Sequence, residues 1–428
     1  MQFGRSIVPQ CKFNKKRGEK QEKERAGASR PTSGGWQLEG NIVTLRNMKK
    51  TAILAAAALI TLAAGAQEAL RGGQQILSPE INPDNTVTFR LLAPGAGSVK
   101  VEGDFPGGEL ANDGSGLWSF TTAEPLAPEL YSYTFSVDGV RTLDPGNVYV
   151  NRDIATLSNF FLIDGGPEAL YGVADVPHGT VARLWYDSPA LGMKRRMAVY
   201  TPPGYEEGTE AYPVFYLLHG AGGDEEAWLA LGRAAQIMDN LIARGEAEPM
   251  IVVMTNGNAV QSAAPGESAD GLVVPAMDIS RMNRGDFEKA FPDVVNYIDG
   301  HYRTRPEKSG RAIAGLSMGG FHSLHISKQY PDMFDYIGLF SAAIMPPQGS
   351  SSPIYDDMEG KLKRQFEKAP KLYWIAIGEE DFLYDANVEF RKMLDEGGYP
   401  YTYVESDGAH IWRNWRSYLS QFAPLLFK

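Results

Sequence analysis

The chain has 428 residues, of which 43% are hydrophobic and 22% are charged, and its formal net charge is −11. This composition excludes a collagen-like, coiled-coil or largely disordered protein, and the length allows two domains. An acidic chain repels nucleic acid and anionic lipid, so neither is expected as a partner.

The first 66 residues differ in character from the rest. Residues 48–66 read MKKTAILAAAALITLAAGA, with two lysines, an apolar run of 16 residues from Thr51 to Ala66 and a final Ala-Gly-Ala. This order is typical of a secretory signal peptide, and the apolar run is short for a membrane span. Because a signal peptide begins at the start codon, we interpret residues 1–47 as an over-extended gene model. We therefore expect an exported protein, periplasmic or secreted, without stable insertion into a membrane.

Loss of residues 1–66 would change the charge and the redox chemistry of the chain. This segment holds 12 of the 41 basic and 4 of the 52 acidic residues, so the remainder would carry a net charge of −19. The single cysteine, Cys11, would also be lost. Disulfides and a cysteine nucleophile are thereby excluded from the exported form.

Residues 67–165 show short alternating runs separated by turn residues. Strands are predicted at 86–94, 98–105, 117–123, 130–139 and 147–151. Their spacing, with no amphipathic helix among them, predicts a small immunoglobulin-like β-sandwich domain. Trp118 is expected in its core. A linker is placed at 166–182, where Gly, Pro and Asp cluster.

Residues 183–428 alternate between buried strands and helices. Strands are predicted at 183–188, 195–203, 212–220, 250–257, 311–314, 336–343, 371–378 and 401–406, and helices at 226–246, at 287–302 and after Ser317. Uninterrupted apolar strands are typical of burial on both faces. The pattern predicts an α/β domain with a doubly wound, mostly parallel sheet, whose first two strands form an antiparallel edge.

The stretch AGLSMGG places Ser317 between Gly315 and Gly319, after a predicted strand and before a helix. A G-x-S-x-G pattern in this setting is typical of a nucleophile elbow, where glycines allow a strained turn and helix amides face an oxyanion. We predict Ser317 as the nucleophile and the Met318 N–H as one oxyanion donor. The loop LLHGAGG would supply the second donor, the N–H of Ala221 or, as the alternative, that of Gly220.

A serine nucleophile needs a base and a group that orients the base. His410 lies in a loop between the last predicted strand and the last helix, where an α/β-hydrolase carries its base. Asp381, in the loop after the penultimate strand, is the predicted acid, and the order Ser, Asp, His is that of α/β-hydrolases. The competing acids are Glu379, Glu380 and Asp385.

No metal and no cofactor are predicted. His322 and His325 have an H-x-x-H spacing that is not a zinc signature, so surface or packing roles are expected for them.

Four ordered segments carry a family resemblance: VYTPPGYEEG…YPVFYLLHGAGGDEEAW, AIAGLSMGGF, IGEEDFL and GAHIWRNWR. They resemble the esterase D group of α/β-hydrolases over roughly 183–428, in particular carbohydrate esterase family one, which contains feruloyl and acetylxylan esterases. The resemblance implies an α/β-hydrolase fold and a triad of Ser317, Asp381 and His410. The segments FRLLAPGAGSVKVEGDF, DGSGLWSF and YSYTFSVDGVRTLDPGN resemble carbohydrate-binding module family 48.

The resemblance implies a serine esterase that hydrolyses feruloyl esters on plant cell-wall xylan through an acyl-enzyme. The expected partner is a plant cell-wall polysaccharide or a feruloylated oligosaccharide; the sequence carries no signal for an oligomeric state. Alternatives are an acetylxylan esterase, another esterase D-type enzyme such as an enterochelin-type esterase, and a non-catalytic glycan-binding protein. Trp228, Phe382 and Trp412 lie beside the catalytic segments and either stack on a feruloyl ring or sugar or pack in the core.

Overall fold

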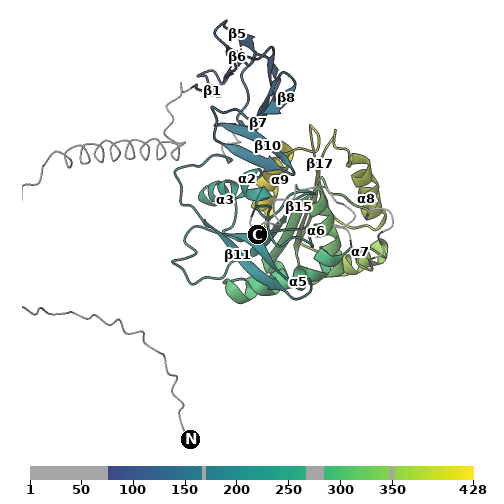
Figure 1. Cartoon of the computed structure of the whole chain (residues 1–428). Helices are drawn as coiled ribbons and strands as arrows, with labels where there is room; N and C mark the ends of the chain where they lie inside the picture. Colours follow the sequence, from purple (N-terminus) through teal and green to yellow (C-terminus); the bar gives the residue numbers. More distant parts are fainter. Residues whose placement is uncertain (1–75, 166–169, 267–283, 347–349, 351) are drawn as a thin grey trace, which may run out of the picture. The chain divides into compact units, whose positions relative to one another are not determined.

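The structure is a computed structural model that describes residues 76–165, 170–266, 284–346, 350 and 352–428, all within one unit, Gln75–Lys428 (Figure 1). The predicted signal peptide at 48–66 and the segment 1–47 lie outside the described residues, as does part of the predicted linker. Among the described residues, no helix has the length and apolar character that a membrane span requires.

The first part of the described chain forms two antiparallel sheets. One has the order β1-β2-β6-β5, and the other has the order β4-β3-β7-β10-β9, with β8 paired to β7. The first sheet contains β1 (Glu80–Ile81), β2 (Val87–Leu92), β5 (Ala111–Asn112) and β6 (Leu117–Thr121). The second contains β3 (Val99–Gly103), β4 (Gly108–Glu109), β7 (Glu129–Val137), β8 (Val140–Thr142), β9 (Val150–Asp153) and β10 (Thr156–Ile163).

The two sheets bury one shared aromatic core. Phe89 of β2 packs against Tyr133 of β7 and Phe161 of β10, with ring centroids 4.9 and 5.8 Å apart. Trp118 is 8% exposed and donates from its indole to the carbonyl of Ala93 at 2.9 Å, so the prediction that it is a core residue is confirmed. The core residues of β2 and β7 thus alternate along each strand, as the period of the sequence indicates.

The sequence analysis missed β10. It pairs with β9 through a tight turn at Ile154 and Ala155, and Ile154 has a φ of 55°. Two-residue turns of this kind usually contain Asn or Gly, which the sequence pattern would reveal, whereas isoleucine is not a turn-forming residue.

The second part is built on an eight-stranded sheet with the order β11-β12-β14-β13-β15-β16-β17-β18. The strands are β11 (Thr180–Ser188), β12 (Met193–Thr201), β13 (Val214–Leu218), β14 (Ile251–Thr255), β15 (Arg311–Leu316), β16 (Tyr336–Phe340), β17 (Leu372–Gly378) and β18 (Thr402–Ser406). β11, β12 and β14 pair antiparallel, and the remaining pairs are parallel, so the predicted mostly parallel sheet with an antiparallel edge is confirmed. β11 begins at Thr180, inside the predicted linker.

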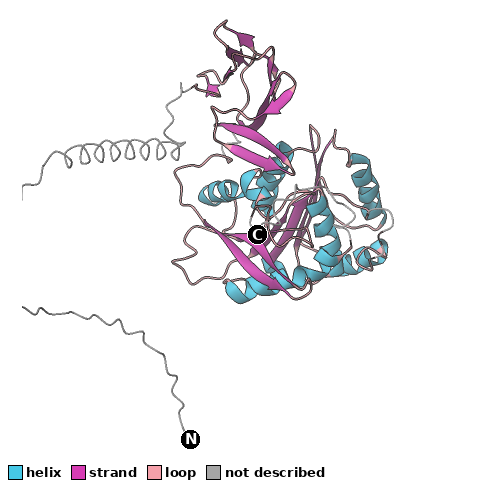
Figure 2. Cartoon of the chain, in the orientation of Figure 1, coloured by secondary structure: helices cyan, strands magenta, loops and turns pink. Residues whose placement is uncertain are grey.

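Helices cover both faces of this sheet (Figure 2). They are α2 (Ala227–Ala230), α3 (Ala234–Ala243), α5 (Asp286–His301), α6 (Met318–Gln329), α7 (Met358–Glu367), α8 (Tyr384–Glu396) and α9 (Trp412–Phe422), with short 3₁₀ turns at Lys308–Gly310 and Ala423–Leu425. α3 and α9 contribute to the core on one face, and α5, α6, α7 and α8 contribute to the core on the other. The single helix predicted at 226–246 is wrong: it is broken into α2 and α3 at Arg233, whose φ of 54° is left-handed.

Candidate active site

Ser317 occupies a sharp turn between β15 and α6. Its backbone has φ 53° and ψ −112°, a conformation that serine rarely adopts. The turn is held by the Ser317 N–H, which donates to the carbonyl of Phe340 at 2.9 Å, and by the Ala343 N–H, which donates to the carbonyl of Ser317 at 3.1 Å.

The two flanking glycines are required by close packing. A Cβ on Gly315 would lie 2.5 Å from the carbonyl carbon of Gly319, and a Cβ on Gly319 would lie 2.3 Å from the carbonyl oxygen of Leu218. Any larger side chain would therefore push the turn away from the neighbouring strand β13.

His410 is oriented by Asp381. The Nδ1 of His410 lies 2.8 Å from Oδ2 of Asp381, and the other carboxylate oxygen accepts the Leu383 N–H at 2.9 Å. Burial alone would raise the pKa of Asp381, but the hydrogen bonds from His410 and from the Leu383 amide outweigh it and hold the pKa below its ordinary value. The competing acids Glu379, Glu380 and Asp385 are exposed on the surface. The structure therefore brings the predicted acid and base together.

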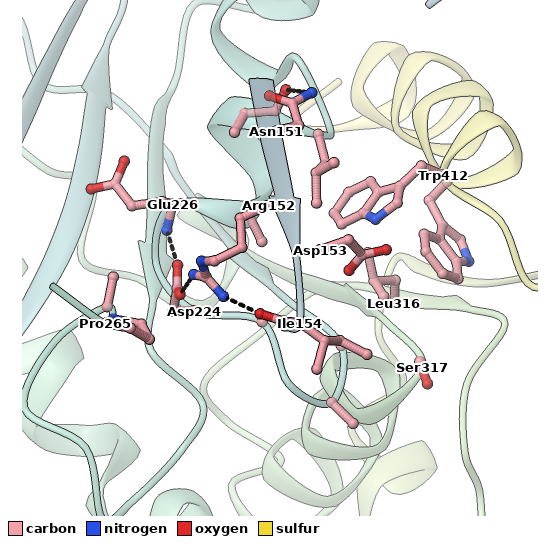
Figure 3. A pocket seen from close by; sticks show the side chains of 18 of the residues that line it. Asn151, Arg152, Asp153, Ile154, Asp224, Glu226, Pro265, Leu316, Ser317 and Trp412 are labelled. Atoms are coloured by element: carbon pink, nitrogen blue, oxygen red, sulfur yellow. Dashed lines mark hydrogen bonds and ion pairs between the residues drawn. The ribbon is translucent and has the colours of Figure 1, made fainter. Parts of the chain in front are cut away.

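Ser317 and His410 line the same cavity, which has a volume of about 600 Å³ (Figure 3). Gly220 and Ala221, from the loop after β13, line it as well. Within the described part of the chain, the N–H groups of Met318 and Ala221 have no hydrogen-bond acceptor. The same holds for the N–H of Gly220 among the described residues, so the predicted donors Met318 and Ala221 and the alternative Gly220 are all available.

His219 fixes the loop that carries Ala221. Its Nδ1–H donates to the carbonyl of Gly220 at 2.7 Å, and its Nε2 accepts the N–H of Gly257 at 2.7 Å. The bond accepted at Nε2 requires the neutral ring, and burial lowers the pKa of His219 to about 4. The sequence analysis assigned no role to His219, although its place in LLHGAGG is a signal for a role in the loop.

The three predicted aromatic contacts have different outcomes. Trp228 does not line the cavity: it is 1% exposed, and its indole donates to the carbonyl of Leu218 at 2.9 Å. Of the two roles predicted for it, core packing is confirmed and stacking on substrate is not, because its ring packs edge-on against that of Trp412 with centroids 5.4 Å apart. Phe382 and Trp412 line the cavity, and Phe382 is 75% exposed with its ring 4.6 Å from that of His410.

Sequence reasoning missed two groups of lining residues. Trp415 lies one helical turn after Trp412 on α9, with its ring 4.9 Å from that of His410. Its spacing in GAHIWRNWR was available as a signal. The second group is the segment Val150–Ile154, which comes from the first pair of sheets and which no local pattern connects to Ser317.

Residues 188–426 match the model of a family described as "Putative esterase". The chain belongs to this esterase family. With Ser317 at the strand-to-helix turn, the esterase is a serine ester hydrolase of the α/β-hydrolase fold.

Three relatives illustrate the similarity. The esterase is 30% identical over 358 residues to an endo-1,4-beta-xylanase/feruloyl esterase of Xylanibacter ruminicola, with 82% of this chain and 46% of that protein covered. The chain thus spans about half the length of this curated relative. A ferulic acid esterase structure aligns with a TM-score of 0.49 at 26% identity over 58% of this chain and 97% of that one. The enterobactin esterase FES of Shigella flexneri aligns with a TM-score of 0.56 at 17% identity, covers 80% of this chain and 93% of that one, and shows a common fold.

Proposed function

We propose that this esterase hydrolyses feruloyl esters on plant cell-wall xylan through an acyl-enzyme intermediate. The observation that carries the proposal is the shared cavity: Ser317 and the Asp381-bound His410 open into one aromatic-lined space. The feruloyl group is suggested by the name of the Xylanibacter relative.

In the first half of the reaction, Ser317 Oγ attacks the ester carbonyl while His410 accepts the hydroxyl proton at Nε2. Asp381 holds the Nδ1–H of the same ring and stabilises the imidazolium that forms. Because the pKa of Asp381 is lowered, its carboxylate is ionised at neutral pH and performs this role there.

The N–H groups of Met318 and Ala221 then stabilise the oxyanion of the tetrahedral intermediate. Collapse of the intermediate breaks the bond to the alcohol oxygen, which takes the proton from His410. In the second half, water attacks the acyl-enzyme with His410 again as base, and ferulate leaves.

The cavity has room for a large acyl group. A volume of about 600 Å³ falls within the range of sites that enclose drug-sized ligands, far more than an acetyl group needs. One side of the cavity is apolar and aromatic, which suits a phenylpropanoid ring; it is lined by Leu231, Trp412 and Trp415.

Release of acid from arabinoxylan tests the proposal. The wild type should release ferulate, and Ser317→Ala should lower kcat by at least about 10³-fold, because no other group can form the acyl-enzyme. Ser327→Ala is the matched control, since Ser327 lies on the same helix and bonds only to its own helix carbonyl at Leu324. Release of acetate alone would replace the proposal with acetylxylan esterase activity. Full activity of Ser317→Ala would refute the nucleophile.

We further infer that the two-sheet part is an immunoglobulin-like module of the family 48 type and that the chain is exported. The shared core between its sheets supports the first inference, and the signal-peptide pattern at 48–66 supports the second. Mass spectrometry of the exported protein should find Gln67 at or near its N-terminus. A peptide from residues 1–47 would overturn the inferred start.

A further inference from the structure

The β9–β10 hairpin of the two-sheet part forms one wall of the cavity that contains Ser317. Asn151, Arg152, Asp153 and Ile154 all line this cavity (Figure 3). They are separated from Ser317 by more than 150 residues of sequence and come from a sheet that is distinct from the eight-stranded one.

The tip of the hairpin rests on the loop that carries the oxyanion donor. Gly222 has a φ of +76°, and a Cβ there would lie 2.7 Å from Cγ1 of Ile154. Ile154 itself has a φ of 55°, a left-handed conformation that is strained for a β-branched residue. A strained residue pressed against a catalytic loop indicates that the hairpin is held in a required position.

Arg152 is fixed by contacts on two sides. Its Nη1 donates to the carbonyl of Ile154 at 2.7 Å, and its Nη2 pairs with the carboxylate of Asp224. Asp224 is buried and also accepts the N–H of Glu226 at 3.0 Å, so the anchor is itself rigid. A guanidinium has five N–H donors, and these contacts leave others to face the cavity, where the Arg152 side chain is 27% exposed.

The lining of the cavity is divided by polarity. Trp412 and Leu316 lie on the side toward Ser317, while Arg152 and Asp224 lie across from them (Figure 3). Arg152 offers donors on its side of β9, whereas the carboxylate of Asp153, the next residue, extends to the other side beside Trp412 and Leu316 and offers acceptors there (Figure 3). Donors from Arg152 and acceptors from Asp153, which flank the cavity on either side of β9, match the hydroxyls of a sugar, whereas the rings of Trp412 and Trp415 match a phenyl ring.

We propose that Arg152 and Asp153 form the subsite for the alcohol half of the ester, and that this alcohol is a sugar. The inference rests on the proposed function, because it assigns the hairpin residues Arg152 and Asp153, here called the polar wall, to the glycosyl group and the rings of Trp412 and Trp415, the aromatic wall, to the acyl group. Both residues are specificity-determining and take no part in the bond changes at Ser317.

The test compares a sugar ester with a small-alcohol ester of the same acid. For wild type and Arg152→Gln, kcat/KM is measured on feruloylated arabinosyl-xylo-oligosaccharide and on methyl ferulate. Loss of charge-assisted hydrogen bonds to the sugar should lower the ratio of the two values by roughly 10- to 100-fold. Asp153→Asn, which removes the charge at nearly constant shape, should lower the ratio in the same direction.

Arg90→Gln is the matched control, because Arg90 belongs to the same pair of sheets, pairs with Glu80 at 2.7 Å and is 28% exposed. It lies outside the cavity and should leave the ratio unchanged. If Arg152→Gln does not fold, Arg152→Lys takes its place, because lysine keeps the positive charge beside Asp224. The ratio of kcat/KM on the sugar ester to kcat/KM on methyl ferulate then tests the proposal in this variant.

Equal changes on both esters, or no change on either, would overturn the proposal. An equal loss on both feruloyl esters with no loss on methyl cinnamate would assign the polar wall to the phenol instead of the sugar, and would also overturn it. The proposed function fails by a different result. In that case the wild type is inactive on feruloyl esters but active on acetylated xylo-oligosaccharide. The ratio of that substrate to ethyl acetate then tests the sugar subsite independently of the acyl group.

Discussion

Arg416 and Glu129 form a buried ion pair that should govern stability. Arg416 lies on α9 and Glu129 begins β7, and their side chains are 3% and 8% exposed. The Nη2 and Nε of Arg416 donate to Oε1 of Glu129 at 2.8 and 3.1 Å, and Nη1 donates to the carbonyl of Leu231 at 2.9 Å. The perturbation is Arg416→Met, which keeps much of the side-chain volume and removes every one of these donors.

The expected loss of stability is large because the buried carboxylate loses its hydrogen-bonded cation and keeps only the more distant charge of Arg413. Removal of one partner of a buried pair costs about 3–5 kcal/mol. Burial already raises the pKa of Glu129, although the charge and hydrogen bonds of Arg416 lower it. Without Arg416 the pKa should rise further, and protonation at acid pH should then relieve the buried charge. A carboxyl with a raised folded pKa stabilises the fold at low pH and loses that contribution as pH rises through the folded pKa. The destabilisation should therefore be larger at pH 8 than at pH 5.5.

Urea unfolding, followed by circular dichroism at both pH values, measures the effect. The four proteins are wild type, Arg416→Met, Glu129→Gln and the double variant. The double variant should be more stable than the sum of the single effects predicts, by about 1–3 kcal/mol. Arg90→Met with Glu80→Gln is the exposed control pair, with an expected coupling of about 1 kcal/mol or less. Single effects that add within about 0.5 kcal/mol, or a cost independent of pH, would refute this reasoning.

Two further predictions concern the turn and the loop beside Ser317. Gly319→Ala places a Cβ 2.3 Å from the carbonyl oxygen of Leu218 and should lower kcat by more than about 10²-fold through displacement of the elbow. Gly300→Ala is the control: its Cβ meets open space on α5, so it should raise the free energy of unfolding by about 0.5–1 kcal/mol. Retained activity of Gly319→Ala would contradict the packing argument. His219 has a pKa of about 4 against an ordinary value of 6.5, so its contribution to stability is full above pH 6.5 and is lost as pH falls toward 4. That loss is roughly 3 kcal/mol in the free energy of unfolding. His219→Gln removes the titrating group, so the free energy of unfolding should vary less between pH 4 and pH 6.5. An unchanged slope would contradict the lowered pKa of His219.

The sequence predicted the parts of the site that depend on local geometry. Ser317 lies in a strand-turn-helix unit, and Asp381 and His410 follow the ends of successive parallel strands, where the carboxyl ends of such strands meet at one edge of the sheet. The pattern that places Trp228 near the catalytic loops does not tell which way its ring points. The indole turns inward to donate to Leu218, a packing choice that depends on the whole core.

The contribution of the β9–β10 hairpin could not be predicted for a different reason. Val-Asn-Arg-Asp at 150–153 has the composition of an ordinary exposed strand, and its contact with Asp224 joins residues 72 positions apart. Only the assembled fold brings the two charges together. The buried ion pair of Arg416 and Glu129 makes a second contact of this kind. It joins β7, which lies in the same sheet as β9 and β10, to α9, the helix that carries Trp412 and Trp415. The ion pair thus joins the sheet that contains the β9–β10 hairpin to the helix that carries Trp412 and Trp415, two elements that line the cavity from different parts of the chain.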